Sequence, residues 1–521
     1  MTTRPRKPRL LVTLWALAAV LFVAGVWSSR APAQDTVGEP ADTVATPGPL
    51  GAQIDTAAAR SPRSPQASEA GARAAEAREA LETPLHERLI SILGIGVMVL
   101  LAWLLSVDRS AFPLRLVLWG TALQLVFALI ILRTTAGEQF FALVNDAFIQ
   151  LLDYTKAGAR FIFGNLVDNN LPVGTPLGDP ATAPIQPAEP PSFAAAGSYF
   201  AFTVLPTIIF FSSFMTVLYY LRIMQWVVKG MAWVMQRTMG TSGAETLSAS
   251  GNIFVGQTEA PLMIKPFVQK MTMSELHCVM TGGFATVAGG VMAAYVGMLV
   301  AYFPDIAGHL LAASVMSAPA AILISKVMYP EDAEPETKGS LKADVPTPDV
   351  NVIDAAARGA GEGLTLALNV GAMLLAFIAL VALLNGLIGW AGGIVGWEDL
   401  SIQLLLGWLL APLAWIMGVP WGDAVEIGSL LGIKTVLNEF VAYLQLAGSL
   451  QQDTTLEPRS VVIATYALCG FANFSSIAIQ IGGIGGIAPS RRGDLSRIGM
   501  RAMIAGTLAS FMTATVAGAI L

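Results

Sequence analysis

The chain has 521 residues, of which 54% are hydrophobic and only 13% are charged, and its formal net charge is −6. Soluble domains carry roughly 25% charged residues, so this composition excludes an ordinary soluble domain and indicates an integral membrane protein. No basic stripe with interleaved aromatic residues occurs, so nothing in the sequence suggests nucleic-acid binding. Both cysteines, Cys278 and Cys469, lie in apolar segments and are expected to be buried thiols.

The first 33 residues are typical of a secretory signal. A basic stretch (4–9) precedes an apolar run (10–27), and Ala31-Pro32-Ala33 resembles a cleavage site. An uncleaved signal-anchor is the alternative, and in either case the segment that follows would be exported. Residues 34–86 are rich in Ala, Pro, Glu, Ser and Thr and poor in aromatic residues, which predicts a disordered exported tail.

About eight apolar segments approach the ~20 residues that a membrane crossing requires. Basic residues gather mainly on one side of the resulting topology, which predicts that both termini lie on the exported side. Residues 139–167 are amphipathic and are expected to lie in the membrane interface, and residues 168–196 form a Pro-rich exported loop. The predicted crossings are 87–106, 113–132, 199–221, 274–303, 306–328, 360–390, 460–487 and 502–521.

Two polar stretches are predicted to be re-entrant helical hairpins. The first, 243–268, contains Gln257-Thr258-Glu259 and is expected to enter from the cytoplasm. The second, 401–445, is expected to enter from outside, to break near residues 412–422 and to end at Leu437-Asn438-Glu439-Phe440. Irregular backbone at membrane depth is tolerated only where it is buried in protein or lines a water-filled cavity, so both hairpins are expected to border a polar pocket.

Each hairpin is followed by a span interrupted at Gly-Phe-Ala, at residues 283–285 and again at 470–472. Matched hairpins of opposite orientation are typical of the inverted repeats of secondary transporters, whose substrate and ion sites lie at the repeat interface. The expected fold is therefore an all-α integral membrane protein with about eight transmembrane helices, two oppositely oriented re-entrant hairpins, interfacial helices and an inverted repeat.

The chain is expected to consist of seven parts. They are the signal peptide or signal-anchor (1–33), the disordered tail (34–86), scaffold helices with the interfacial helix (87–242), the first re-entrant hairpin and broken span (243–303), spans and a cytoplasmic loop (304–400), the second re-entrant hairpin and broken span (401–487), and the final span (488–521).

Glu259 and Glu439 are the strongest site candidates, because a carboxylate at membrane depth is costly unless it is paired or solvated. A structural ion pair or a helix cap is the alternative.

Asn438, in an apolar run, is expected to hydrogen-bond between helices. No nucleotide-binding loop occurs, so ATP-driven transport is not expected. The neutral polar residues of the two units are Asn252, Gln257, Thr258, Asn473, Ser475 and Ser476.

The sequence resembles the concentrative nucleoside transporter family, of the bacterial sodium-coupled type, over roughly residues 87–521. The motifs that carry this resemblance are Gly251-Asn252-Ile253-Phe254-Val255-Gly256-Gln257-Thr258-Glu259, Ser274-Glu275-Leu276-His277, Gly283-Phe284-Ala285-Thr286-Val287-Ala288-Gly289, Asn438-Glu439-Phe440-Val441-Ala442-Tyr443 and Tyr466-Ala467-Leu468-Cys469-Gly470-Phe471-Ala472-Asn473.

The resemblance implies a homotrimeric, cation-coupled importer of nucleosides such as uridine and adenosine. It implies an elevator motion in the bacterial inner membrane, and no enzyme activity or prosthetic group. The substrate residues that it implies are Gln257, Thr258 and Glu259 facing the nucleobase, Val291 packing against it, Glu439, Asn473 and Ser476 at the ribose hydroxyls, and Phe471 lining the pocket.

The resemblance also implies a sodium site made of the Asn252 and Thr286 side chains and the carbonyls of Val255 and Val287. Oxygen ligands of this kind suit a hard cation. A proton-coupled importer, with Glu259 or Glu439 as the proton carrier, is the near alternative. An intramembrane hydrolase and a channel or sensor are the distant ones, and no Asp-Asp dyad, His-metal motif or nucleophile elbow favours the hydrolase.

Overall fold

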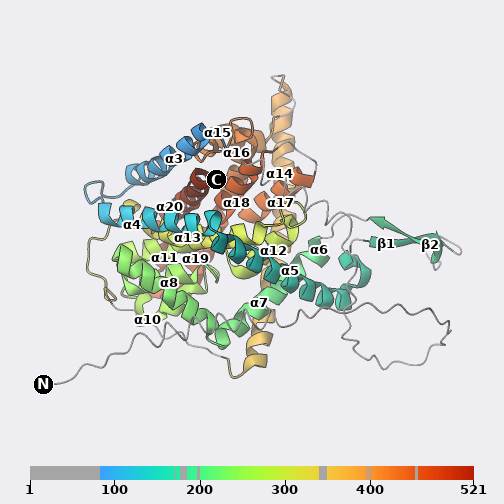
Figure 1. Ribbon diagram of the computed structural model, residues 1–521, viewed down its shortest axis with the longest axis horizontal. Helices are drawn as coiled ribbons and strands as arrows, with labels where there is room; N and C mark the ends of the chain where they lie inside the picture. The colour runs from blue at the N-terminus through green and yellow to red at the C-terminus, as the bar shows by residue number, and fades with distance from the viewer. Residues whose placement is uncertain are drawn as a thin grey trace. The chain divides into compact units, whose positions relative to one another are not determined.

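Long apolar helices make up most of the fold (Figure 1). The computed structural model describes residues 83–168, 170–176, 185–195, 200–339, 349–394, 396–397, 400–451 and 456–521. The predicted signal segment, and the predicted tail up to residue 82, lie outside this part of the chain. Within it, seven helical segments are long and apolar enough to cross a membrane. They are Leu85–Leu104, Leu114–Arg133, Phe200–Tyr220, Met273–Leu299, Ile306–Met328, Val352–Ile394 and Pro489–Ile520.

The eighth predicted crossing, 460–487, consists of two shorter helices because the backbone leaves helical geometry between them. Cys469, after the first of these helices, has an extended conformation, and Gly470 has a φ of 156°. The predicted all-α membrane class is thus confirmed, and the difference in number comes from this break.

The first two long helices pack on helices from later in the chain, α3 on α20 (Arg492–Ile520) and α4 on α13 (Ile306–Met328), and two short strands follow them. The predicted interfacial helix is a single helix, α5, whose N-terminus is capped by the Thr134 side chain accepting a hydrogen bond from the Gly137 N–H. The elements are α3 (Leu85–Leu104), α4 (Leu114–Arg133), α5 (Thr135–Phe163), η1 (Gly164–Asp168), β1 (Asn170–Pro176) and β2 (Ile185–Ala195).

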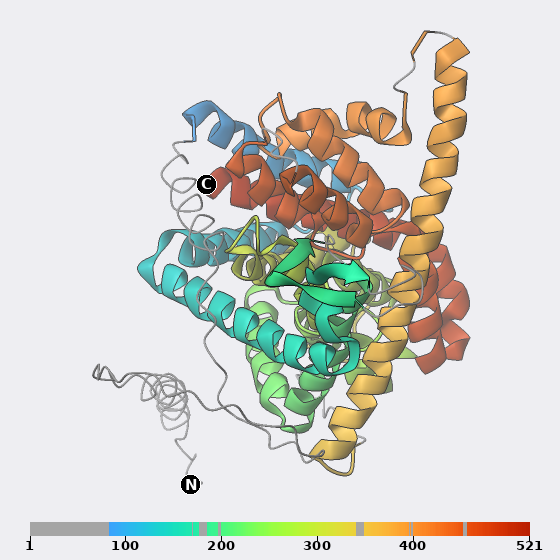
Figure 2. The same ribbon diagram turned by 90° about the vertical axis from the view of Figure 1, so that its right-hand side faces the viewer.

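Strands β1 and β2 form an antiparallel hairpin inside the stretch expected to be a Pro-rich loop (Figure 2). Its prolines obscure the strand pattern, because proline cannot donate a hydrogen bond to a β-ladder and is confined to edge strands. In a two-stranded sheet both strands are edges, so the prolines are tolerated. The hairpin is an addition to a fold that is otherwise helical in its described part.

Three helices follow the strands, and the later helix α14 packs on one of them, α7, and lines the pocket described below. They are α6 (Phe200–Thr203), α7 (Leu205–Tyr220), α8 (Ile223–Met239) and α14 (Val352–Ile394). Helix α14 has 43 residues, more than the predicted 360–390, and runs along one side of the helices in Figure 2. It packs closely on α7 at Gly363, where a Cβ atom would lie 2.8 Å from the Ile209 Cα.

The first predicted repeat unit begins with a short helix and an irregular stretch that ends at Glu259. A broken span follows, interrupted after Ala285 where Thr286 adopts an extended conformation. The elements are α9 (Gly243–Gly251), η2 (Ala260–Ile264), α10 (Lys265–Val268), α11 (Met273–Ala285) and α12 (Gly289–Leu299), followed by α13 (Ile306–Met328).

The second unit turns between Ile416 and Ala424, in the region that the sequence suggested (412–422), and breaks again where the predicted hairpin ends, just before its acidic residue. Helix α15 continues through Pro412, and the chain turns only after it ends. A further break at Leu437, which has φ −100° and ψ −90°, directly precedes Glu439 and is the counterpart of the stretch before Glu259. The elements are α15 (Ile402–Ile416), α16 (Ala424–Val436), α17 (Glu439–Gln451), α18 (Pro458–Leu468), α19 (Phe474–Ile487), η3 (Pro489–Arg491) and α20 (Arg492–Ile520).

The two broken spans cross at their breaks and satisfy each other's backbone. The Phe471 N–H donates to the Thr286 carbonyl at 3.3 Å. The Ser510 hydroxyl of α20 bonds the Cys469 carbonyl at 3.2 Å and lies 3.5 Å from the Ala285 carbonyl. Unpaired backbone groups in an apolar interior are costly, so these bonds explain how two helices can be interrupted at one place.

The crossing predicts a strong effect of a single methyl group at Gly470. A Cβ atom there would lie 2.8 Å from the Phe284 carbonyl oxygen and 2.7 Å from the Ser510 hydroxyl. We expect Gly470→Ala to lower the apparent Tm of the detergent-purified protein by several degrees, because overpacking in a filled core is destabilising. The control is Gly448→Ala, since no atom lies within 4 Å of a Cβ at that position. Equal Tm values for the two variants would contradict this account of the crossing.

Candidate functional site

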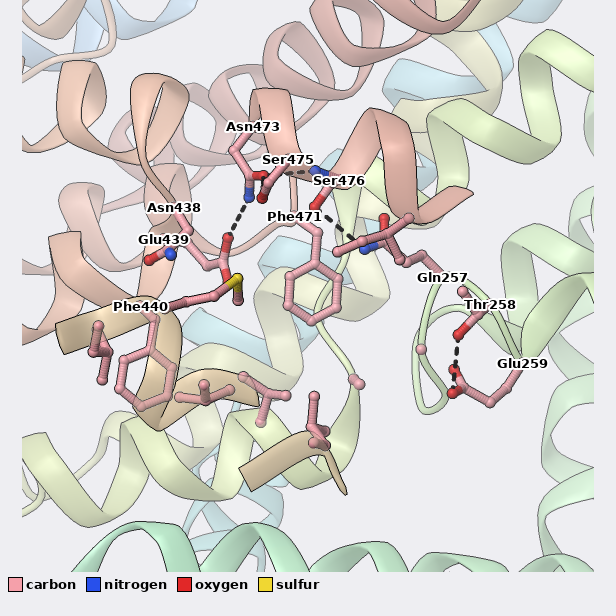
Figure 3. Close-up of a pocket in the computed structure, with 18 residues that line it drawn as sticks. Gln257, Thr258, Glu259, Asn438, Glu439, Phe440, Phe471, Asn473, Ser475 and Ser476 are labelled. Atoms are coloured by element: carbon pink, nitrogen blue, oxygen red, sulfur yellow. Dashed lines mark hydrogen bonds between the residues drawn. The ribbon is translucent and has the colours of Figure 1, made fainter. Parts of the chain in front are cut away.

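A pocket lies where the two units and α14 meet (Figure 3). The space among its lining residues totals about 750 Å³ and includes open solvent. All the side chains predicted to hold the substrate line this pocket, although the two units are far apart in sequence. The lining residues are Gly256, Gln257, Thr258, Glu259, Ala288, Val291, Leu366, Val370, Met373, Leu374, Asn438, Glu439, Phe440, Phe471, Asn473, Ser475, Ser476 and Ile479.

The pocket has a polar side and an apolar side that come from different elements. The polar residues belong to the stretch before η2 and to the starts of α17 and α19. Leu366, Val370, Met373 and Leu374 of α14 provide an apolar wall, and they recur at helical spacing along one face. A ligand in this space would therefore make its directional contacts with the two units and only apolar contacts with α14.

Glu439 is held at both of its carboxylate oxygens. Its Oε2 accepts a hydrogen bond from Asn473 Nδ2 at 2.9 Å, and its Oε1 accepts one from the Tyr295 hydroxyl at 3.0 Å. Asn473 is fixed in turn, because its Oδ1 accepts from the Ser476 N–H at 2.9 Å and caps the N-terminus of α19. Two donors of this kind keep a carboxylate in one orientation and leave its remaining lone pairs available to a ligand.

Tyr295 is a site residue that the sequence analysis did not identify. Its side chain is fully buried on α12, and its ring stacks on that of Tyr443 at a centroid distance of 4.3 Å. It follows Val291 by four residues, so the two share a face of α12, and this spacing was the signal available in the sequence. Through Tyr295 the first unit positions the carboxylate of the second.

Gln257 is also positioned by a residue outside the predicted set. Its Nε2 donates to the Ser476 hydroxyl at 3.2 Å, and its Oε1 accepts from Gln480 Nε2 at 3.0 Å. Gln480 is fully buried on α19, and its Nε2 also lies 3.1 Å from the Met280 carbonyl. Because Gln480 donates to the oxygen of the Gln257 amide, the nitrogen of that amide is directed toward Ser476 and the pocket.

Glu259 is the more exposed of the two predicted carboxylates. Its Oε1 accepts a hydrogen bond from the Thr258 hydroxyl at 3.0 Å. Among the described residues, neither Glu259 nor Glu439 forms an ion pair. A structural ion pair, which was the alternative explanation for these carboxylates, is therefore not what the described part of the structure contains.

Asn438 differs from its expected role as a bond between helices. It lines the pocket, and its Oδ1 accepts from the Val441 N–H at 2.9 Å, which caps the start of α17. Asparagine is favoured at such positions, because its short side chain bonds to nearby backbone groups. It thereby sets the direction of the helix that begins with Glu439.

The residues predicted to hold a cation lie beside the first break. Asn252 caps the end of α9 and is fully buried, and both polar atoms of its side chain lack a hydrogen-bond partner in the described part of the chain. Its Nδ2 would lie 3.3 Å from a Cβ atom at Gly282, near the end of α11. The Gly289 N–H donates to the Phe254 carbonyl at 3.0 Å, which joins this stretch to the break.

The other members of this set occupy the same two segments. Val255 belongs to the stretch that follows α9, while Thr286 and Val287 form the break itself. The Thr286 hydroxyl donates to the Gly282 carbonyl at 3.0 Å, so its lone pairs remain free to accept. Leaving a buried amide unsatisfied costs about 1–3 kcal/mol, and oxygen ligands from a cation shell would remove that cost for Asn252 Oδ1.

Hairpin-like stretches and interrupted helices that converge on a polar pocket define the architecture of a secondary transporter. Models of the "Na+ dependent nucleoside transporter" family match residues 93–166 (N-terminus) and 309–518 (C-terminus), and a "nucleoside recognition" model matches residues 201–302. The chain belongs to the Na+-dependent nucleoside transporter family. It is accordingly a membrane-spanning nucleoside transporter and not an enzyme.

Individual relatives agree with this assignment. An uncharacterized transporter of Haemophilus influenzae is 46% identical over 82% of this chain and 96% of its own length. Sodium/nucleoside cotransporter 1 of Mus musculus is 42% identical over 83% of this chain and 64% of its own. The solved structure of CNTnw in an inward-facing substrate-bound state has a TM-score of 0.73 and 41% identity over 83% of this chain and 97% of that one.

The position of Tyr295 predicts a specific effect on substrate affinity. We expect Tyr295→Phe to raise the KM for nucleoside uptake roughly tenfold, because a hydrogen bond to a charged group contributes about 1.5–3 kcal/mol. The measurement is the concentration dependence of uptake into proteoliposomes. Tyr443→Phe is the matched control, because this hydroxyl bonds the Thr465 carbonyl and not Glu439. An unchanged KM for Tyr295→Phe would rule out the positioning role.

Proposed function

We propose that the protein is a sodium-coupled importer of nucleosides such as uridine and adenosine. It works in the bacterial inner membrane as a homotrimer, by an elevator-type alternating access, with both termini on the exported side. The observation that carries the proposal is one pocket in which Glu439, Asn473 and Gln257 converge, beside a buried Asn252 amide with no partner in the described part of the chain.

The chemistry of the pocket suits the two halves of a nucleoside. Ribose hydroxyls are donors that the Glu439 carboxylate accepts, while Asn473 and Ser476 complete a polar patch around it. The amide of Gln257, with Thr258 and Glu259, offers donors and acceptors to the edge of a nucleobase. Every polar atom of a ligand taken out of water needs such a partner.

Apolar residues of the pocket suit the flat faces of the base. Val291 belongs to α12, Phe471 lies at the break between α18 and α19, and both line the pocket. Aromatic rings pair favourably in offset or edge-to-face geometry, so Phe471 is the residue that stacks on the ligand. These roles follow the ones that the sequence resemblance implied.

Sodium is the proposed coupling ion, held by the Asn252 and Thr286 side chains and the carbonyls of Val255 and Val287. The partnerless Asn252 amide supports this assignment, because a hard cation prefers oxygen ligands. The bond between the Gly289 N–H and the Phe254 carbonyl ties the ion site to the stretch that ends in Glu259. Sodium binding would thus order the residues that meet the base.

Proton coupling through Glu259 is the second candidate. It is favoured by the exposure of this carboxylate to the pocket and by the lack of an ion pair to it among the described residues. The deciding experiment measures radiolabelled uridine and adenosine uptake into proteoliposomes under separate inward gradients of sodium and of protons. Accumulation above equilibrium only with sodium supports the proposal, accumulation only with protons moves the coupling to a carboxylate, and none with either overturns the importer.

We expect Glu439→Gln to abolish most uptake while the protein still assembles. The substitution preserves the size of the side chain but replaces one accepting oxygen by an NH2 group. Tyr295 and Asn473 both donate to the carboxylate of Glu439, so one of these donors would then face the NH2 group. The ribose hydroxyls would also lose the charged acceptor. Uptake and the elution volume of the purified protein are measured together. Glu426→Gln, in the first turn of α16 and outside the pocket lining, is the control. Normal uptake by Glu439→Gln would remove Glu439 from the site.

We expect Asn252→Ala to raise the sodium concentration needed for half-maximal uptake by at least tenfold. The alanine removes a side-chain ligand without adding bulk, and the stretch beside it keeps its backbone bonds. Sodium dependence is measured at constant ionic strength with choline as the replacement ion. Thr258→Ala, in the same stretch but at the substrate side of the pocket, should change substrate affinity more than sodium dependence. Identical sodium curves for the two variants would contradict the ion site.

A further inference from the structure

The two units place different side chains at equivalent points. In each unit, a helix that leads to the acidic residue packs against the first half of the broken span: α9 against α11, and α16 against α18. Near the end of α9 stands Asn252, seven residues before Glu259, and near the end of α16 stands Lys434, five residues before Glu439. The counterpart of a neutral amide is thus a side chain with a positive charge.

Lys434 is fully buried, and its position calls for an explanation. Its Nζ donates to the Ala467 carbonyl at 2.7 Å and lies 5.8 Å from the centroid of the Phe511 ring. In the described part of the chain it forms no salt bridge with a carboxylate. A buried ammonium is costly unless other groups compensate its charge, so the surroundings of this group must act as the counter-charge.

The Glu439 carboxylate attracts this ammonium without contacting it, and the end of α18 adds further counter-charge. Ala467 lies in the last turn of α18, which ends at Leu468. The last carbonyls of a helix lack intrahelical partners and carry the negative end of the helix dipole, which stabilises a cation. Phe511 adds the negative face of an aromatic ring at the outer limit of cation–π distance.

The C-terminal end of α11 corresponds to the end of α18, but no positively charged side chain is placed beside it in the part of the chain that the structure describes. It ends at Ala285, directly before the break, and the Asn252 amide beside it has no partner among the described residues. The two helix ends are joined through Ser510, whose hydroxyl lies near the Ala285 carbonyl and bonds the Cys469 carbonyl. The end of α18 therefore binds the Lys434 ammonium, whereas beside the end of α11 the Asn252 side-chain oxygen has no partner among the described residues.

We propose that Lys434 is a built-in cation that fills, in the second unit, the place that the coupling ion fills in the first. The inference rests on the proposed function for the first unit only, where Asn252 binds the exchangeable ion. The ammonium keeps α16 and α18 together whether or not an ion is present, and so keeps the break before Glu439 in its binding geometry. Lys434 is a positioning residue, and ion binding controls only the stretch before Glu259.

Replacement of Lys434 by a short amide tests this directly. Lys434→Asn removes the charge and leaves space and an oxygen ligand, as Asn252 does in the first unit. Lys434→Met removes the charge but fills the space with an apolar chain. The readout is the apparent Tm of the full-length protein, purified in sodium and titrated with sodium against choline at constant ionic strength, without substrate.

We expect both variants to lose stability in choline, and only Lys434→Asn to regain it as sodium rises, in a second transition that the wild type lacks. Lys434→Met should keep the wild-type sodium response at a lower Tm. A Lys434→Asn titration that matches wild type, or that lacks the additional transition, overturns the proposal. Failure of Lys434→Asn to fold even in high sodium also overturns it, because sodium would then be unable to replace the ammonium.

The double variant Asn252→Ala/Lys434→Asn separates this inference from the proposed function. It should lose the wild-type sodium transition and keep the additional one. If the wild type shows no sodium transition but Lys434→Asn gains one, the sodium site of the first unit fails while the role of Lys434 stands. If the double variant loses both transitions, the additional transition belongs to the first unit and the inference about Lys434 fails.

Discussion

The fold depends on satisfying backbone hydrogen bonds where two helices are interrupted inside an apolar interior. Water is not available there to bond the freed N–H and C=O groups, so the interruptions are placed against each other. Thr286 accepts from Phe471, and Ser510 of α20 bonds the end of α18. Because both breaks must lie at one point, the polar residues beside them also gather at one point, and the pocket follows from the backbone requirement.

The polar side of the pocket behaves as one connected network. Ser476 contacts Asn473 through its N–H and Gln257 through its hydroxyl, so the groups assigned to the ribose and to the base share a residue at the start of α19. Tyr295 of α12 and Gln480, one turn further along α19, hold the outer ends of this network. In such networks the effect of one substitution depends on the others, and double variants among these residues should not be additive.

Much of this site could be predicted from the sequence, because charges and glycines inside apolar segments stand out. Glu259, Glu439 and the repeated Gly-Phe-Ala located both units and the broken spans. Tyr295 and Gln480 could not be found in the same way, because an aromatic residue or a single amide in an apolar helix is most often part of the packing. Their partners are fixed only when the two units come together.

The places of the breaks in the second unit could be predicted from the sequence, but the residues that cause them could not. Pro412 lies inside α15 and the turn of the second unit follows it after Ile416, while the break before Glu439 lies where the predicted hairpin ends, at Leu437, a residue with no turn preference. Asn438 provides the local reason, because its side chain restarts the helix by bonding the Val441 N–H. The strands β1 and β2 were predicted as a loop, because a proline-rich sequence is typical of loops.

The apolar wall that α14 contributes to the pocket has a mechanical consequence. Hydrogen bonds fix a ligand at one point along a surface, whereas apolar contacts are non-directional and scale with contact area. Leu366, Val370 and Leu374 form a stripe along α14 with no donor or acceptor among them. In the proposed elevator motion, a bound solute would therefore slide along this stripe without breaking directional contacts, while its polar contacts would move with the two units that hold it.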